Sequence, residues 1–282
     1  MSGQRIRGRR VLVTGAGSGL GRAIAARFAA DGCRVLLTDV NAAAVTEAAA
    51  ALGGTPDVAA LPLDVTDDDA WARARAWCEE NWGGLDILVN NAGVAAAGRI
   101  DAIPVEDWRW ILETNLMSAV RGCRTFVPLL KAQGHGHVVN VASLAGLLTP
   151  PAMGSYNVTK AAVVALSDTL RSELTPYGIR TTLVCPGFVR TNLAASVRSP
   201  DPAMVDLTNK LVNGSKLSAE EVAAQVVSAV NRGRYLVLTE RVGRVAWLAK
   251  RYVPGLVHRQ TVAAARRLRD RIERGARSGA AQ

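Results

Sequence analysis

Short, continuous apolar runs alternate with helical patterns along most of the chain, and this alternation restricts the possible folds more than any other feature. We count seven apolar runs and six helical patterns, with no internal repeat and no Pro/Gly/Ser-rich linker between them. Runs without an alternating polar face are typical of parallel strands that are buried on both sides. Joined by right-handed crossovers, they predict a single α/β domain with a doubly wound, seven-stranded parallel sheet and helices on both faces.

The boundaries of these elements follow from caps and from glycine or proline breaks. The predicted strands are 9–14, 34–39, 58–64, 85–90, 137–142, 180–185 and 235–239. The predicted helices are 22–30, 41–52, 66–81, 104–131, about 151–174 and 218–231. Asn41 and Thr66 stand where N-caps are expected, and Ser218 with Glu221 has the spacing of a capping box.

Composition excludes several other classes of protein. With 282 residues, 49% of them apolar, the chain can bury a large core. The four cysteines have neither CxxC nor metal-ligand spacing, and no histidine has ligand spacing, so we expect a reduced, cytoplasmic protein without a metal. We find no signal peptide and no apolar run of about 18 residues, and therefore expect no membrane-spanning helix.

A glycine-rich turn, Gly15-Ala-Gly-Ser-Gly-Leu-Gly21, joins the first strand to the first helix. Glycines let a ligand approach the backbone closely, and the start of a helix offers free N–H groups and the positive end of its dipole. This position favours the binding of a cofactor phosphate, although such a turn can also be only a tight loop. The spacing is not GxGxxG, and no Gly-Lys-Ser/Thr follows as in a P-loop.

Asp39 ends the second strand, 24 residues after Gly15. A carboxylate at this place can accept hydrogen bonds from the adenosine ribose diol and would repel a 2′-phosphate. Because the residues at positions 18 and 40, Ser18 and Val40, are not basic, the sequence favours NAD over NADP. A structural role for Asp39 as a helix cap is the alternative.

Polar residues also follow the next strands. Asp64 and Val65 end the third strand, where they can hold the adenine of a cofactor. Asn90-Asn-Ala-Gly93 ends the fourth strand, and we expect Asn90 mainly to stabilise the sheet. Asn115 is an unusual residue for a helix interior. It is either an ordinary surface residue or one that holds a water molecule.

The segment from Ser143 to Lys160 carries the predicted chemistry. Tyr156 and Lys160 are four residues apart and therefore share one face of the expected helix. A lysine ammonium beside a phenol favours the phenolate, so we expect a lowered pKa for Tyr156 and a role as proton donor or acceptor. Ser143, at the end of the fifth strand, can hydrogen-bond a substrate oxygen. Taken alone, Tyr-x-x-x-Lys also occurs in helices by chance.

Together these motifs resemble those of the short-chain dehydrogenase/reductase family in its single-domain, Rossmann-like form. The matching motifs are Thr14-Gly15-x3-Gly19-x-Gly21, Asp64-Val65, Asn90-Asn-Ala-Gly93, Asn115, Ser143, Tyr156-x3-Lys160 and Pro186-Gly187 followed by Thr191, in family order over residues 8–240. The resemblance implies an NAD cofactor and a catalytic tetrad of Asn115, Ser143, Tyr156 and Lys160. It also implies a homodimer or homotetramer, formed through residues 104–131 and 151–176. The cofactor-binding residues that it implies are Gly15, Ser18, Gly19, Leu20, Gly21, Asp39, Asp64, Val65, Asn91, Ala92, Gly93, Tyr156, Lys160, Pro186, Gly187, Val189 and Thr191.

The predicted reaction is the reversible oxidation of a hydrophobic alcohol to its ketone or aldehyde, with Tyr156 exchanging the proton of the substrate. The segments expected near the substrate are mostly apolar, which favours a lipid, sterol or terpenoid. The predicted substrate residues are Ala95, Ser143, Leu144, Met153, Tyr156, Phe188 and Leu193. Two alternatives stay open: a sugar epimerase or dehydratase that uses bound NAD, and a non-catalytic NAD-binding scaffold.

The positive charge of the chain is concentrated at its C-terminal end. The formal net charge is +10, and from Arg241 onward eleven Lys/Arg and two acids give +9. We therefore divide the chain into an N-terminal arm (1–8), a catalytic domain (9–240) and a basic amphipathic extension (241–282) that is broken at Pro254-Gly255. The extension either packs on the body or on a second subunit, or contacts an anionic membrane surface. The nearly neutral body disfavours nucleic acid.

Overall fold

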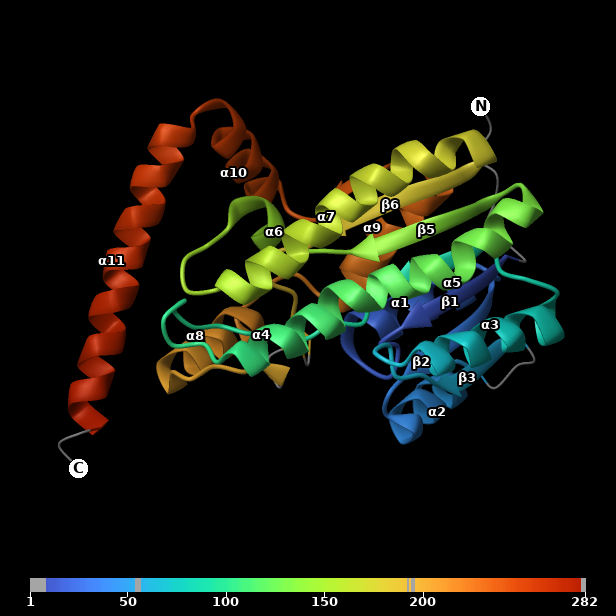
Figure 1. Ribbon diagram of the computed structural model, residues 1–282, viewed down its shortest axis with the longest axis horizontal. Coiled ribbons are helices and arrows are strands. Elements are labelled where there is room, and N and C mark those ends of the chain that lie inside the picture. Colours follow the sequence, from blue (N-terminus) through green and yellow to red (C-terminus); the bar gives the residue numbers. More distant parts are fainter. Residues whose placement is uncertain (1–8, 54–56, 192, 194–195, 280–282) are drawn as a thin grey trace.

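A single parallel sheet forms the centre of the molecule (Figure 1). The computed structural model describes residues 9–53, 57–191, 193 and 196–279, with side chains as far as residue 270. The predicted N-terminal arm, 1–8, lies outside the described residues. The strand order is β3-β2-β1-β4-β5-β6-β7, which confirms the doubly wound fold. The strands are β1 (Arg10–Thr14), β2 (Arg34–Asp39), β3 (Val58–Pro62), β4 (Ile87–Asn90), β5 (Gly136–Val141), β6 (Ile179–Cys185) and β7 (Leu236–Leu238).

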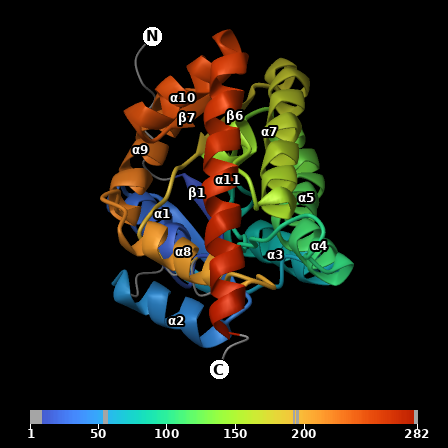
Figure 2. The same cartoon turned by 90° about the vertical axis from the view of Figure 1, so that its left-hand side faces the viewer.

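Helices cover both faces of this sheet, as Figures 1 and 2 show. One face packs against α1 (Gly19–Ala30), α2 (Ala42–Ala51) and α9 (Ala219–Arg232). The other face packs against α3 (Asp68–Trp82), α5 (Ser118–Gln133) and α7 (Gly154–Leu174). Successive strand residues point to opposite faces, so Val11 joins the first core and Leu12 the second. Because both faces are buried, the strands read as continuous apolar runs.

Several element boundaries differ from those expected. The helix predicted for 104–131 consists of α4 (Val105–Leu112), the π-helical turn η1 (Glu113–Met117) and α5. Two further helices, α6 (Leu144–Leu148) and α8 (Pro202–Asn213), lie in segments for which we predicted neither helix nor strand.

Two of the three predicted helix caps are confirmed. Asn41 caps α2, and Ser218 and Glu221 form the capping box of α9. The predicted cap Thr66 is wrong, because its N–H and hydroxyl both donate to Asp64 and the side chain of Asp67 caps α3 instead.

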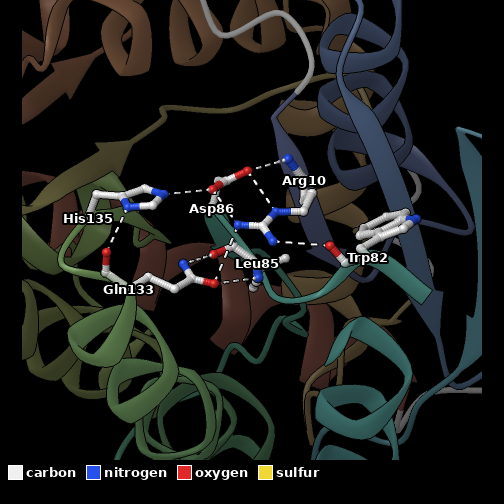
Figure 3. A network of polar contacts seen from close by, with 6 residues as sticks. All are labelled: Arg10, Trp82, Leu85, Asp86, Gln133 and His135. Carbon is white, nitrogen blue, oxygen red and sulfur yellow. Dashed lines mark hydrogen bonds and ion pairs between the residues drawn. The ribbon is translucent and has the colours of Figure 1, made fainter. Parts of the chain in front are cut away.

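A network of charged and polar side chains closes the amino edge of the sheet (Figure 3). Arg10 Nη2 lies 2.8 Å from Asp86 Oδ1, and Arg10 Nε donates to Asp86 Oδ2 at 3.0 Å. His135 Nε2 is 3.1 Å from Asp86 Oδ1. Gln133 completes the network by pairing with both the N–H and the C=O of Leu85. These contacts join the starts of β1, β4 and β5 at the edge farthest from the glycine turn.

The extension forms two helices that both contact the domain. α10 (Arg241–Tyr252) packs on α6 and β7, and α11 (Pro254–Gly279) contacts α8. The two helices meet at Pro254, in agreement with the predicted break. Figure 2 shows α11 running across the end of the molecule where the strands have their carboxyl ends. Packing on the body, one of the alternatives for the extension, is therefore observed.

Candidate active site

The carboxyl edge of the sheet gathers residues that are far apart in the sequence. The glycine turn follows β1, Asp39 ends β2, Asn91 follows β4, Ser143 follows β5 and Pro186 follows β6. In open parallel sheets, ligands bind outside the carboxyl ends of the strands, at the point where the strand order reverses. That point lies here between β1 and β4.

The glycine turn has the shape of a phosphate-binding loop. Gly15 and Gly19 have φ angles of 63° and 53°, in the left-handed region that favours glycine. A Cβ atom at Gly21 would overlap the carbonyl oxygen of Gly15, so the start of α1 can approach β1 only without a side chain there. Ser18, the N-cap residue of α1, makes no side-chain capping bond. The first N–H groups of α1 thus lack this cap and suit a pyrophosphate.

Asp39 lies beside this turn and is held in place by backbone donors. Its Oδ2 accepts a hydrogen bond from Gly17 N at 3.0 Å, and its Oδ1 accepts one from Asn41 N at 3.0 Å. Asn41 caps α2 through Ala44 N, so the alternative of Asp39 as a cap is wrong. The carboxylate is thus fixed next to the glycine turn, at the place where a ribose diol would be recognised.

Thr14 connects the glycine turn to the end of β4. Its Oγ1 accepts hydrogen bonds from Asn91 N and Ala92 N, both at 3.0 Å, while Asn91 Nδ2 donates to Thr14 O at 2.9 Å. We had not assigned Thr14 a role, although its place directly before the first glycine was a usable signal. Asn90 Nδ2 donates to Asn140 Oδ1 at 2.9 Å, which supports the expected role of Asn90 in the sheet.

Ser143 and Tyr156 lie close together beyond the end of β5, where the Ser143 hydroxyl opposes the rise that burial causes in the pKa of Tyr156. Ser143 is the N-cap residue of α6, where its Oγ accepts a hydrogen bond from Ala145 N at 3.1 Å. Tyr156 lies in the first turn of α7, which begins at Gly154 and not near Pro151. Both side chains are buried. The pair therefore places two hydroxyl groups at one point of the carboxyl edge.

The expected lowering of the Tyr156 pKa is wrong for the protein alone. Burial raises the pKa of Tyr156, and the hydrogen bond with Ser143 counteracts this only in part. Lys160 Nζ lies 5.8 Å from the centre of the Tyr156 ring and donates to Val141 O at 3.1 Å. Burial lowers the pKa of Lys160 to about 8. The four-residue spacing does bring the two residues together, but burial has the largest effect on the pKa of each.

Asn115 lies in the π-helical turn η1 and contacts the segment that follows β4. Its Oδ1 accepts a hydrogen bond from Val94 N at 2.7 Å, and its Nδ2 donates to Val94 O at 2.9 Å. A methyl group at Gly93 would lie 3.1 Å from Asn115 Oδ1 and 3.4 Å from Lys160 Nζ. Asn115 is buried, so the alternative of a surface residue is wrong. Single π-helical turns often mark functional sites.

Apolar side chains surround Tyr156. It shares a cluster with buried Ala96 and Ile111 and with partly buried Val94, Trp110, Ala145 and Met153. We had predicted Met153 but had missed Ile111 and Trp110, which come from α4. Arg198 lies 3.9 Å above the Trp110 ring and pairs with Asp107 at 3.4 Å. Its charge is therefore held outside the cluster.

Some predicted residues are not brought into this cluster. Phe188 and Leu193 are exposed to 41% and 36%, and Ala95 and Leu144 are buried. The carboxylate of Asp64 accepts from Thr66, while Val65 is buried beside α3. Thr191 Oγ1 lies 3.4 Å from Val189 O, in the segment after Pro186. Contacts of these residues with a cofactor or substrate stay predictions.

The extension contacts α6, the helix whose N-cap residue is Ser143. The sequence did not predict this contact. Lys250 Nζ donates to Leu147 O at 2.8 Å and to Thr149 Oγ1 at 2.9 Å. A Cβ atom at Gly243 would overlap Leu144 Cδ1, and Trp247 packs in the same apolar cluster as Leu144. α10 therefore packs against α6, the helix whose N-cap residue is Ser143.

The family of the chain is shown by comparison with known proteins. The model of the family described as "short chain dehydrogenase" matches residues 9–202, more than half of the chain. The chain therefore belongs to the short chain dehydrogenase family.

Individual relatives agree with this assignment. The chain is 36% identical to "Probable oxidoreductase EphD" of Mycobacterium tuberculosis, over 79% of this chain but only 39% of EphD. The chain thus spans less than half the length of that relative. It is 31% identical to the NADP-dependent (R)-specific alcohol dehydrogenase of Lentilactobacillus kefiri, over 72% of this chain and 82% of that enzyme. A short-chain dehydrogenase/reductase from Burkholderia phymatum, solved in complex with NAD, superposes with a TM-score of 0.85 at 31% identity, covering 90% of this chain and 96% of that one.

Among the described residues, no group of three or more His, Cys, Asp or Glu side chains could hold a metal ion. No helix in the described part of the chain is both long and apolar enough to cross a bilayer.

Proposed function

We propose that this chain is an NAD-dependent oxidoreductase that interconverts a hydrophobic alcohol and its ketone or aldehyde, with Tyr156 as the acid/base. The observation that carries the proposal is the position of Tyr156, which lies beside Ser143 and in an apolar cluster at the same edge as the glycine turn. The apolar surroundings favour a substrate with little charge around its reacting carbon.

The residues of the chain have distinct roles in this proposal. Tyr156 exchanges a proton with the substrate oxygen, and Ser143 orients that oxygen by a hydrogen bond. Lys160, with a pKa of about 8, can give or take a proton near neutral pH. Asn115 fixes the end of β4 through Val94 and lies close to Lys160.

The cofactor is assigned to the glycine turn and to Asp39. A bound nicotinamide supplies the hydride acceptor for oxidation or the hydride donor for reduction. NAD is favoured because the carboxylate of Asp39, fixed beside Gly17, would repel a 2′-phosphate. The similar structure from Burkholderia phymatum holds NAD, whereas the alcohol dehydrogenase from Lentilactobacillus kefiri is NADP-dependent.

We also infer that copies of the chain associate through α4, α5 and α7. These helices contain the segments 104–131 and 151–176, and each of α4 and α7 exposes a valine, Val105 and Val158. Light scattering after size-exclusion chromatography should show a dimer or tetramer. A monomer at micromolar concentration would contradict this inference.

The function is tested by a panel of hydrophobic alcohols, offered with NAD and with NADP and read at the absorbance of the reduced nicotinamide. We expect NADH to form with at least one alcohol, and more slowly with NADP. Tyr156→Phe should lower the rate by a factor of about 10² to 10⁴, because the acid/base group is lost. If Tyr156→Phe forms NADH at the wild-type rate, the mechanism is wrong. Tightly bound NAD without net turnover would instead indicate an epimerase or dehydratase.

A further inference from the structure

The junction of α10 and α11 exposes a patch of large apolar side chains. We call it the elbow patch, and its members are between 38% and 80% exposed. They are Val242, Val245, Leu248, Tyr252, Val253 and Leu256. Of the fourteen large apolar side chains that are exposed in the described part of the chain, these six fall within fifteen consecutive residues. Single exposed apolar residues are ordinary, but a concentrated group of them marks a contact surface.

The spacing along α10 separates this patch from the face that packs on the domain. Val245, Leu248 and Tyr252 are three and four residues apart and therefore form one stripe along the helix. Gly243, Trp247 and Lys250 lie on the opposite face, where they meet α6. The elbow patch consequently points away from the body, and in Figure 1 the α10–α11 junction projects beyond the sheet.

Positive charge accompanies the patch. Arg244 and Arg251, seven residues apart, lie along one side of the stripe, and α10 contains no acidic residue. Residues 241–270 contain eight Lys/Arg and one acid, Asp270, which gives a formal charge of +7. An apolar stripe bordered by arginines matches the interface of an anionic membrane, which accepts apolar side chains below the headgroups and cations among them.

We propose that the elbow patch docks this protein on the surface of an anionic lipid bilayer. A second copy of the chain fits less well, because a two-fold contact through the same stripe would bring the two rows of arginines together. Tyr252 suits the interface because its ring is apolar and its hydroxyl group can stay hydrated. This proposal does not depend on the reaction that the active site performs.

The test is co-sedimentation of the full chain with vesicles of phosphatidylcholine mixed with phosphatidylglycerol, compared with phosphatidylcholine alone. We expect binding to the anionic vesicles that weakens as salt is added. Val245→Asp should weaken binding about tenfold or more, because it removes apolar contact and adds a repelled charge. Arg244→Gln should weaken it about fivefold, the effect of one cation near an anionic surface.

Ile100→Asp is the matched control, since Ile100 is 73% exposed and lies outside the extension. It changes the net charge as Val245→Asp does, and it should leave vesicle binding unchanged. Circular dichroism should show that all three variants are folded. Wild-type protein that ignores anionic vesicles, or a Val245→Asp variant that binds them like Ile100→Asp, would overturn the proposal. A change of oligomeric state in Val245→Asp without any vesicle binding would assign the patch to a second copy.

Discussion

The two edges of the sheet both bury polar groups, but they differ in how completely these groups are paired. At the amino edge, Arg10 and Asp86 contact each other, and His135 adds a further contact to the carboxylate. At the carboxyl edge, burial lowers the pKa of Lys160 and raises that of Tyr156. Buried charges that are paired with each other can stabilise a fold. Buried ionisable groups without a charged partner have shifted pKa values, which proton transfer can use. The comparison predicts that substitutions at the two edges affect different properties.

The largest expected effect is on activity, from Lys160→Met at the carboxyl edge. The rate of NADH formation should fall about a thousandfold, because the proton-transferring ammonium is lost. The free energy of unfolding in urea should stay equal or rise, since a buried charge is removed. Lys131→Met is the control, because Lys131 lies over the Tyr177 ring at 4.1 Å and should have no effect on the rate. A large loss of stability in Lys160→Met would contradict the comparison, because it would show that the carboxyl edge also stabilises the fold.

Next in size is the loss of stability from Asp86→Asn at the amino edge. The partly buried Arg10 guanidinium, whose side chain is 18% exposed, would be left without its counter-charge, which should lower the free energy of unfolding by about 2 to 3 kcal/mol. The kcat should stay unchanged, because the substitution lies at the far edge of the sheet. The exposed pair of Arg34 and Asp57 provides the control: Asp57→Asn should cost less than about 1 kcal/mol. Equal losses in the two variants would contradict the structural importance of the network.

The pH dependence of stability should come mainly from His137, which is buried in β5 and bonded to Thr182 Oγ1. Burial, assisted by the charges of Arg180 and Arg9, lowers the pKa of His137 from 6.5 to about 3. Between these values the unfolded chain binds a proton that the folded chain does not, so stability falls as the pH falls. We expect a loss of about 2 kcal/mol between pH 7 and pH 4.5.

The control for this effect is His137→Gln, which should flatten the slope in urea titrations over that range. Asp86 does not interfere. Burial alone would raise its pKa, but hydrogen bonds from Arg10 lower it below 3.8, so its contribution is lost only in stronger acid. An unchanged slope in His137→Gln would show that another group is responsible.

The smallest expected effect comes from Lys250→Met. Lys250 belongs to the extension but contacts α6 at the carboxyl edge of the sheet. Loss of the bonds to Leu147 O and Thr149 Oγ1 should loosen α6 and raise the KM for the alcohol about fivefold, as expected for about 1 kcal/mol. The kcat should change less than twofold, and Lys250→Arg should restore part of the affinity. If the variant lost thermal stability but kept the wild-type KM, Lys250 would only stabilise the fold and would not affect substrate binding.

The sequence predicted the sheet and most of the motif positions, because each motif is local and follows a recognisable strand. Gly15, Asp39, Asn91 and Ser143 come directly after apolar runs, so parallel pairing had to bring them to one edge. Their roles toward a cofactor or substrate stay predictions.

The direction of the Tyr156 pKa shift could not be predicted in this way. The spacing to Lys160 is visible in the sequence, but the burial of Tyr156 depends on Ala96, Ile111 and other residues distant in the chain. The same limit applies to the extension. Its amphipathic pattern was clear, yet the contact of Lys250 with α6 joins residues about a hundred positions apart.

The π-helical turn has a consequence for chain length. Such a turn holds one residue more than the α-helical turn it replaces, so α4 and α5 are out of phase by one position. Deleting one residue between Glu113 and Met117 would let this segment close into a regular helix, with α4 and α5 keeping about the same orientation, and would change only the side-chain positions inside the turn. Asn115, which lies inside the turn, would then lose its position opposite Val94, whereas Ile111 in α4 would stay beside Tyr156. In this segment, the number of residues matters as much as their identity.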